Sequence, residues 1–373
     1  MHAMEAAWDL IIIGAGLAGS SCAWHLSRKG AGRILLLERE AMAGTQATAQ
    51  NAAMIRALCG VPQLSAFAKA GQAFWNAPPA ELDLADAYRP VGSLLLVSQP
   101  ASLAALRLEV DQARALGLDC RMLSPEELRA RSPLLQDCPI LGGAWTPGDG
   151  IADPAALNAA WITGARARGV CVQLSRGVSR LLLHEGRIQG VVLDDGERLR
   201  ASQVLVAAGA WAGQVLSESG LSDHGLIPHR RHLFCTLEND RIEEDHPFVW
   251  HLDLHAYFRP ESGGFLFSAC DETQAAPGPP EVAPGIEAFA YDRMQGVFPF
   301  LSELPLKRYW AGLRTFGPRP GFLLGPDEDT EGLLHASGLG GHGVTCAPEV
   351  GRRLAEAWPA PRSDPRSTPL SAP

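Results

Sequence analysis

Near its amino terminus the chain reads Asp9-Leu-Ile-Ile-Ile-Gly14-Ala-Gly16-Leu-Ala-Gly19, and this stretch says more about the fold than any other. An apolar strand enters a G-x-G-x-x-G turn and a helical pattern leaves it, which is the order of a dinucleotide pyrophosphate site. Gly14 allows the tight turn, Gly16 lets the backbone approach phosphate, and Gly19 lets the helix pack closely on the strand. The helix amino terminus adds free N–H groups and the positive end of a dipole.

A second apolar run, Ile34-Leu-Leu-Leu37, ends at Glu38, 19 residues after Gly19. A carboxylate at this place can accept hydrogen bonds from the ribose hydroxyls of a dinucleotide. A glycine-rich turn alone is weak evidence, because such turns also occur in purely structural βαβ units. Here strand, turn, helix, second strand and acid follow in order, so the sequence predicts a dinucleotide site.

Length and composition narrow the class of protein. The 373 residues suffice for two domains or one large α/β unit. The net charge of −9, with no basic run among aromatic residues, argues against a nucleic-acid partner. The eight cysteines form no C-x-x-C pair and no metal-binding spacing, so we expect reduced thiols and no metal site. No apolar stretch reaches the length of a membrane span, and the first strand leaves no room for a signal peptide, so we expect a cytoplasmic protein.

The pattern along the chain predicts alternating elements. Helices are expected at residues 17–29, 63–76, 100–117, 286–296 and 346–357, and after the start signals Ser124 and Asp153. Strands are expected at residues 91–97, 170–174, 178–183, 188–193 and 202–211, and as aromatic-rich runs near 232–237, 248–259 and 264–269.

This order predicts a discontinuous nucleotide-binding domain of residues 1–83, 142–226 and 322–358. A β-rich domain, expected to carry the substrate site, is inserted as residues 84–141 and 227–321. The expected fold class is α/β, or α+β overall, with a Rossmann-like domain and an inserted antiparallel β-rich domain. Residues 359–373 contain five prolines and few apolar anchors, which predicts a disordered tail.

Taken together, these segments resemble the D-amino acid oxidase-like superfamily of FAD-dependent amine oxidoreductases, which includes glycine and sarcosine oxidases and D-amino acid dehydrogenases. The likeness covers about residues 8–357 and rests on the fingerprint, residues 44–56, Val204–Trp211, Trp310–Arg314 and Gly338–Gly343. Within the group the likeness is closest to bacterial D-arginine dehydrogenase, in Leu36–Ala41, Phe74–Pro79, Pro228–Arg231 and Tyr309–Phe316.

The resemblance implies FAD in the nucleotide-binding domain and a substrate pocket over the flavin, between the two domains. The turn Gly338–Gly343 and the helix after it can supply N–H groups to the flavin N1 and C2=O region, or form an ordinary loop. Covalent members carry a cysteine or histidine at places where this chain has neither, so we expect non-covalent FAD. The expected cofactor-binding residues are Gly14, Gly16, Gly19, Glu38, Arg39, Thr45, Gln46, Thr48, Val178, Ala208, Gly209, Gly338, Gly340, Gly341, Gly343, Val344 and Thr345.

The resemblance also implies a set of substrate-contacting residues. Arg314 is the expected partner of the substrate carboxylate, because guanidinium binds carboxylate through paired N–H groups. Tyr257 is expected in the pocket wall, and Arg230 or its neighbour Arg231 as another pocket arginine. His342 can face the substrate or merely cap the turn. No constellation of side chains suggests a dedicated base, so solvent can take the ammonium proton.

Departures from the resembling enzyme bear on the substrate. The stretch Arg89-Pro-Val-Gly-Ser93 lacks the glutamate that holds a basic side chain there, and Gln46 replaces a histidine. We therefore expect oxidative deamination of a small amino acid, above all a D-amino acid with a neutral side chain, by hydride transfer to flavin N5. A glycine or sarcosine oxidase and a flavoprotein subunit of a heteromeric amine or opine dehydrogenase remain open. An NAD-dependent reductase is disfavoured, because Arg314 and the glycine turn at 338–343 would have no role.

The electron acceptor can be a quinone, a dye or oxygen. Oxygen-using relatives commonly place a lysine over the flavin, and the corresponding stretch, Gly264–Cys270, contains none. We therefore favour a dehydrogenase over an oxidase. A quinone acceptor would allow peripheral association with the inner membrane.

Overall fold

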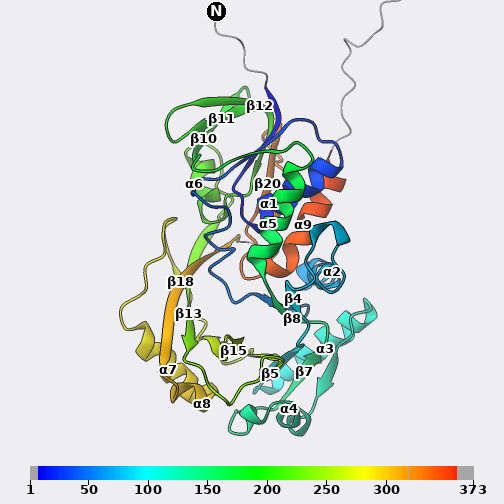
Figure 1. Ribbon diagram of the computed structural model, residues 1–373, viewed down its shortest axis with the longest axis vertical. Helices are drawn as coiled ribbons and strands as arrows, with labels where there is room; N and C mark the ends of the chain where they lie inside the picture. The colour runs from blue at the N-terminus through cyan, green and yellow to red at the C-terminus, as the bar shows by residue number, and fades with distance from the viewer. Residues whose placement is uncertain (1–6, 319, 359–373) are drawn as a thin grey trace, which may run out of the picture.

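The computed structural model describes residues 7–318 and 320–358, so the expected tail at 359–373 lies outside the described residues. Figure 1 shows an upper part, in which a mixed sheet with parallel central strands lies beside α1, α5 and α9, and a lower part, in which a second sheet lies with α3, α4, α7 and α8. This arrangement confirms the expected fold class, a Rossmann-like unit joined to an antiparallel β-rich unit.

The upper sheet has the strand order β10-β11-β12-β1-β2-β9, with β20 and β19 added beyond β12. Its strands are β1 (Trp8–Ile13), β2 (Ile34–Leu37), β9 (Cys171–Gln173), β10 (Val178–His184), β11 (Arg187–Leu193), β12 (Arg198–Val206), β19 (Leu323–Pro326) and β20 (Leu333–Ser337). The helices packed with it are α1 (Leu17–Arg28), α5 (Pro154–Arg166), α6 (Ala212–Ser217) and α9 (Gly343–Glu356), and α2 (Ser65–Asn76) packs against α9. Among the described residues, no helix is both long and apolar enough to cross a membrane.

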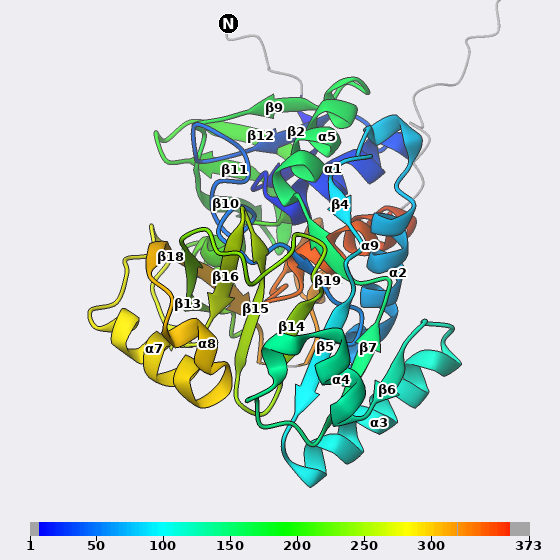
Figure 2. The same cartoon turned by 60° about the horizontal axis from the view of Figure 1, so that its bottom comes forward.

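The lower sheet runs β17-β13-β16-β15-β14-β5-β7-β6, with β18 paired to β13 (Figure 2). Its strands are β5 (Ser93–Val97), β6 (Arg121–Leu123), β7 (Gly142–Thr146), β13 (Ile227–Thr236), β14 (Phe248–His251), β15 (Ala256–Glu261), β16 (Gly264–Ser268), β17 (Thr273–Gln274) and β18 (Leu306–Phe316). Its helices are α3 (Pro100–Ala115), α4 (Pro125–Arg131), α7 (Ile286–Val297) and α8 (Pro299–Ser302). A small sheet, β3 (Met54–Ile55), β8 (Gly150–Ala152) and β4 (Tyr88–Arg89), completes the described strands.

Parallel pairing brings the functional turns to one edge of the upper sheet. Ile13 is paired with Leu37 on one side and with Val206 on the other, and Val206 is paired with His335. The carboxyl ends of β1, β2, β12 and β20 therefore lie side by side. In open α/β sheets, this is the edge where ligands bind.

Two glycines of the first turn are required for different structural reasons. Gly14 has a φ of +99°, and a Cβ there would lie 2.6 Å from the carbonyl oxygen of Ala207. A Cβ on Gly19 would lie 1.9 Å from the carbonyl oxygen of Gly14. The turn therefore needs the first glycine for its conformation and the last one for close packing of α1, as the sequence predicts.

Three expectations need correction. The single strand expected near 248–259 is two strands, β14 and β15, separated by a turn in which His255 has a φ of +49°. The last helix begins at Gly343 rather than near residue 346, because only Gly338 and Gly340 of the glycine turn have positive φ. β7 pairs with β5 and β6 in the lower sheet, so the domain boundary expected at 141/142 falls before a strand of the substrate side. We propose the same division of the chain into domains, with this boundary after residue 146.

Helix α9 contains a proline, and a tryptophan side chain donates the hydrogen bond that the proline cannot make. Pro348 has no N–H, so the carbonyl of Val344 lacks the usual donor four residues later. The indole Nε1–H of Trp75 donates to that carbonyl at 3.0 Å. Gly71 lets α2 come this close, since a Cβ there would lie 1.7 Å from the carbonyl oxygen of Thr345.

Replacing Trp75 by phenylalanine should lower the free energy of unfolding by about 1–3 kcal/mol more than Trp161→Phe does. Both tryptophans are buried, but Trp161 Nε1 has no hydrogen-bond partner among the described residues, so its loss removes only volume. Urea denaturation of the two variants measures the difference. Equal destabilisation would show that the bond to Val344 contributes nothing.

Candidate cofactor and substrate site

A cavity follows the carboxyl edge of the upper sheet and continues toward β18 of the lower sheet. It brings together most of the residues that the sequence singled out: Gly14, Gly16, Glu38, Arg39, Thr45, Gln46, Thr48, Val178, Ala208, Gly209, Arg314, Gly338, Gly340, Gly341, His342, Gly343, Val344 and Thr345. Gly19, Tyr257 and Arg230 do not line it. Gly19 acts one step away, since it lets α1 pack against the first turn.

At one end of the cavity Glu38 is held firmly in place. Its Oε2 accepts a hydrogen bond from the N–H of Ala15 at 2.8 Å, and its Oε1 accepts one from the N–H of Glu40 at 3.0 Å. The side chain is 8% exposed, at the end of β2 and beside the glycine turn. This is the place at which a ribose acceptor is needed in a dinucleotide fold.

The segment around residues 44–50 has a role that its composition only suggests. Gly16, the N-cap of α1, has no side chain to satisfy the first N–H groups of the helix. Thr48 supplies this acceptor, since its Oγ1 accepts a hydrogen bond from the N–H of Leu17 at 3.0 Å. The segment therefore lies against the first glycine turn.

Two buried polar atoms of residues that line the cavity make no hydrogen bond within the described residues. Thr45 Oγ1 and Gln50 Oε1 have no hydrogen-bond partner among the described residues. Buried polar groups in proteins are almost always hydrogen-bonded, so these two atoms fit a polar ligand in the cavity. Arg39 lies over the ring of Trp211, and its guanidinium carbon is 4.6 Å from the ring centroid. Arg39 lines the cavity next to Glu38.

The middle of the cavity is formed by the last glycine turn and the start of α9. Gly343, Val344 and Thr345 are the first three helical residues, and their N–H groups have no partner among the described residues. His342 makes no capping hydrogen bond, so of the two roles left open above the geometry favours the cavity. Burial, together with Arg56 and Arg314, lowers the pKa of His342 to about 3, so its imidazole is neutral.

Arg314 has no acidic partner among the described residues. Its Nη2 donates to the hydroxyl of Tyr257 at 3.3 Å, and the structure gives it no ion pair. It is half-buried on β18 and lines the cavity close to Gly341. A guanidinium in this state is suited to a carboxylate ligand.

Tyr257 lies behind Arg314 rather than on the cavity. Its side chain is fully buried on β15, and its ring lies 4.6 Å from that of Trp250. The hydroxyl accepts the hydrogen bond from Arg314. Tyr257 is therefore a positioning residue for the arginine.

Arg230, which the sequence analysis expected in the substrate pocket, does not line the cavity. Arg314 is paired with His229 across β13 and β18, so Arg230 lies on the opposite face of the strand. Its Nη1 donates to the carbonyl of Glu281 at 3.1 Å. Arg231 shares the face of Arg314 but is ion-paired with Glu272 at 2.6 Å. Neither arginine is therefore among the proposed substrate contacts.

The sequence reasoning missed Arg56 and Trp250, which both line the cavity. The guanidinium carbon of Arg56 lies 4.1 Å from the centroid of the Trp250 ring. Burial lowers the pKa of Arg56, and no acidic side chain is paired with it among the described residues. The only sequence signal was its place at the end of the small-residue segment 44–56, since Trp250 comes from a strand 194 residues later.

Several known proteins are similar to this chain in sequence or in fold. The chain is 25% identical to 4-methylaminobutanoate oxidase (formaldehyde-forming) of Paenarthrobacter nicotinovorans and 27% identical to mitochondrial dimethylglycine dehydrogenase of Rattus norvegicus. Each match covers 93% of this chain but only 43% and 42% of those proteins, so the chain spans less than half of their length. The fold is similar to that of L-proline dehydrogenase from P. horikoshii, with a TM-score of 0.84, 22% identity, and coverage of 95% of this chain and 93% of that one.

The family model described as DAO, FAD dependent oxidoreductase, matches residues 9–357, which include both sheets and the whole cavity. The first glycine turn, Glu38 and the turn before α9 all line this cavity within the matched residues. The chain belongs to the DAO family of FAD-dependent oxidoreductases, and FAD is its cofactor.

Proposed function

We propose that this protein oxidises the C–N bond of a small amino acid with a neutral side chain, in the first place a D-amino acid. One observation carries the proposal: Arg314, a cation without an acidic partner among the described residues, lies on the same cavity as the turn 338–343. A substrate carboxylate bound to Arg314 would hold the substrate in the same cavity as the turn 338–343, which would hold the cofactor. When bound, FAD accepts the hydride equivalent that leaves this carbon.

The charge of the cavity supports a neutral substrate side chain. Glu38 is the one acidic side chain that lines the cavity in the described part of the chain, and it lies at the ribose end. The other end carries Arg56 and Arg314, so a basic side chain would meet two cations and no anion. The likeness to D-arginine dehydrogenase therefore does not extend to arginine as the substrate.

The side chains around the substrate would hold and orient it rather than take its proton. Arg314 binds the carboxylate, and Tyr257 holds the guanidinium in place. His342, with a pKa of about 3, is a weak base and adds no third positive charge beside the two arginines. The ammonium proton therefore passes to solvent before oxidation, as the absence of a dedicated base in the sequence suggests.

A second candidate is a glycine or sarcosine type of amine oxidase, which acts on glycine or on an N-methylated derivative of it. Both relatives reported above are named for substrates with methylated nitrogen, 4-methylaminobutanoate and dimethylglycine. A third is a flavoprotein subunit of a heteromeric amine or opine dehydrogenase, which would need a partner subunit for activity. The mass of the active particle in solution separates this third candidate from the first two.

Anaerobic bleaching of the flavin absorbance tests these candidates. The panel contains D- and L-amino acids with neutral side chains, D-arginine, glycine, sarcosine and dimethylglycine, together with matching amines that lack a carboxylate. We expect the fastest bleaching with a neutral D-amino acid and little with D-arginine or the amines. Faster bleaching by sarcosine or dimethylglycine would favour the second candidate, and equal rates for amines and amino acids would contradict carboxylate binding.

Two further measurements on the same protein test the electron acceptor and the attachment of FAD: reoxidation of the reduced samples, and acid precipitation of the oxidised protein. We propose a dehydrogenase with non-covalent FAD, because β16 carries no lysine, and neither segment 44–48 nor residues 315–318 contain a cysteine or histidine. Reoxidation should be slow in oxygen and fast with a quinone analogue. Acid precipitation should leave the yellow colour in solution. Rapid peroxide formation would contradict the assignment as a dehydrogenase. Colour that stays with the precipitate would contradict non-covalent FAD.

A further inference from the structure

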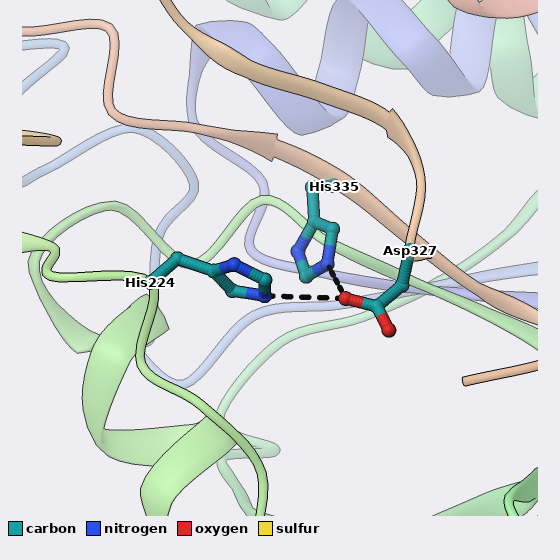
Figure 3. Close-up of side chains that lie close together, drawn as sticks. All are labelled: His224, Asp327 and His335. Carbon is teal, nitrogen blue, oxygen red and sulfur yellow. Dashed lines mark hydrogen bonds and ion pairs between the residues drawn. The ribbon is translucent and has the colours of Figure 1, made fainter. Parts of the chain in front are cut away.

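Three side chains that do not line the cavity meet at the edge of the upper sheet. His224 lies in the loop between α6 and β13, Asp327 directly follows β19, and His335 lies on β20. Figure 3 shows both imidazoles directed at the same carboxylate oxygen. His224 Nε2 lies 3.1 Å and His335 Nε2 lies 2.9 Å from Asp327 Oδ2.

The spacing of these three atoms suits a metal ion. They all lie within 4.8 Å of one another. An ion bound at roughly 2.0–2.2 Å from nitrogen and oxygen ligands holds those ligands about 3–3.5 Å apart. The observed distances need only small side-chain movements to reach that geometry.

The carboxylate and His224 are already oriented by their surroundings. Asp327 Oδ1 accepts hydrogen bonds from the N–H of Thr330 at 2.8 Å and of Asp329 at 3.1 Å, which leaves Oδ2 for the imidazoles. The N–H of His224 donates to Ser222 Oγ at 3.1 Å. Such supporting contacts are what fix ligands in metal sites.

His335 is free to change its protonated nitrogen. Its side chain is 2% exposed, and its Nδ1 is buried with no hydrogen-bond partner among the described residues. Without an ion, the hydrogen bond to Asp327 favours the proton on Nε2. Because no described group contacts Nδ1, the neutral ring can carry its proton there when Nε2 binds a cation. By contrast, the side chain of His224 is 30% exposed, which gives an ion a path to the site and water a place to complete its coordination.

We propose that His224, Asp327 and His335 form a binding site for one divalent first-row transition ion, of which Zn²⁺ is the representative. Two imidazole nitrogens and one carboxylate oxygen are a ligand set for zinc, nickel or iron rather than for magnesium or calcium, which prefer oxygen. The bound ion joins the 218–226 loop to β20, and the cavity-lining run begins one residue after His335. The site therefore stabilises the strand that leads into the cofactor turn.

The test uses the full-length FAD-bound protein, freed of metal by a chelator and titrated with ZnCl₂ by calorimetry. The parent should bind one Zn²⁺ per chain, and zinc should raise its melting temperature. His224→Ala should weaken binding by at least about 10- to 100-fold, since even groups that only orient ligands cost this much. Asp327→Asn keeps an acceptor oxygen but loses the charge, and it should weaken binding as well.

His255→Ala is the matched control, because His255 is an exposed loop histidine with a φ of +49°, close to the +51° of His224. It should bind zinc as the parent does. Parent-like binding in both His224→Ala and Asp327→Asn, no saturable binding in the parent, or equal loss in His255→Ala would overturn the site. The assay contains no substrate, so its outcome is independent of the proposed amino acid oxidation.

Discussion

Replacing Arg314 by alanine should lower kcat/KM for the best amino acid substrate by about a hundredfold. The loss of a charge-assisted, paired contact to a desolvated carboxylate costs about 3 kcal/mol, which corresponds to that factor. Arg314→Lys should also be impaired, because an ammonium cannot reproduce the two parallel N–H bonds. FAD content and melting temperature should stay close to those of the parent, since the cofactor is held mainly by the upper sheet. Steady-state kinetics measure kcat/KM, flavin absorbance measures the FAD content, and thermal denaturation measures the melting temperature.

Two controls make this result specific. Arg308→Ala removes an exposed arginine from the same strand and should leave kcat/KM unchanged. The parent should prefer amino acids strongly over the matching amines, and Arg314→Ala should lose most of that preference. A variant that keeps both its turnover and its preference would show that Arg314 is structural and that the carboxylate binds elsewhere, with Arg56 the next candidate.

Gly19→Ala should abolish most FAD binding and destabilise the fold. The new Cβ would lie 1.9 Å from the carbonyl oxygen of Gly14, and neither backbone can yield without moving α1 away from the first turn. Overpacking of this kind costs about 1–3 kcal/mol, and more where backbone atoms collide. We expect at least a tenfold fall in FAD content after purification and a lower melting temperature.

Gly296→Ala is the matched control for this helix glycine. Gly296 lies in α7, and a Cβ there would meet no atom within 4 Å. Because alanine is a better helix former, this variant should be more stable than the parent by about 0.5–1 kcal/mol. If Gly19→Ala kept its FAD and its stability as Gly296→Ala does, the packing role of Gly19 would be wrong.

Local sequence determined the elements that depend on neighbouring residues. The conformation of the first turn and the helix starts at Ser124 and Asp153 are confirmed: Ser124 and Glu127 form a capping box, and Asp153 accepts from the N–H groups of Ala155 and Ala156. Each of these depends on glycine conformation, capping or a short apolar run. Such signals are complete within about 30 residues, as a βαβ unit is. The role of Glu38 at a ribose stays a prediction.

Strand register decided which arginines reach the cavity. The sequence offered Arg314 for the carboxylate and Arg230 or Arg231 as a further pocket arginine. Pairing of β13 with β18 puts Arg230 on the far face, and Glu272 neutralises Arg231. A shift of one residue would exchange the faces, and the sequence of one strand alone does not reveal its register. The placement of β7 in the lower sheet is decided in the same way, by pairing with β5 and β6.

Long-range contacts decided the rest. Arg56 and Trp250, Trp75 and Val344, and the cluster of His224, Asp327 and His335 join residues from distant segments; His224 and Asp327 are 103 positions apart. The sequence by itself determined the family and the cofactor edge, because a strand, a turn and a helix with their caps are local structures. Only the tertiary structure decided which candidate arginines face the cavity and which side chains form the candidate metal site, because both depend on residues that meet after the two sheets have packed.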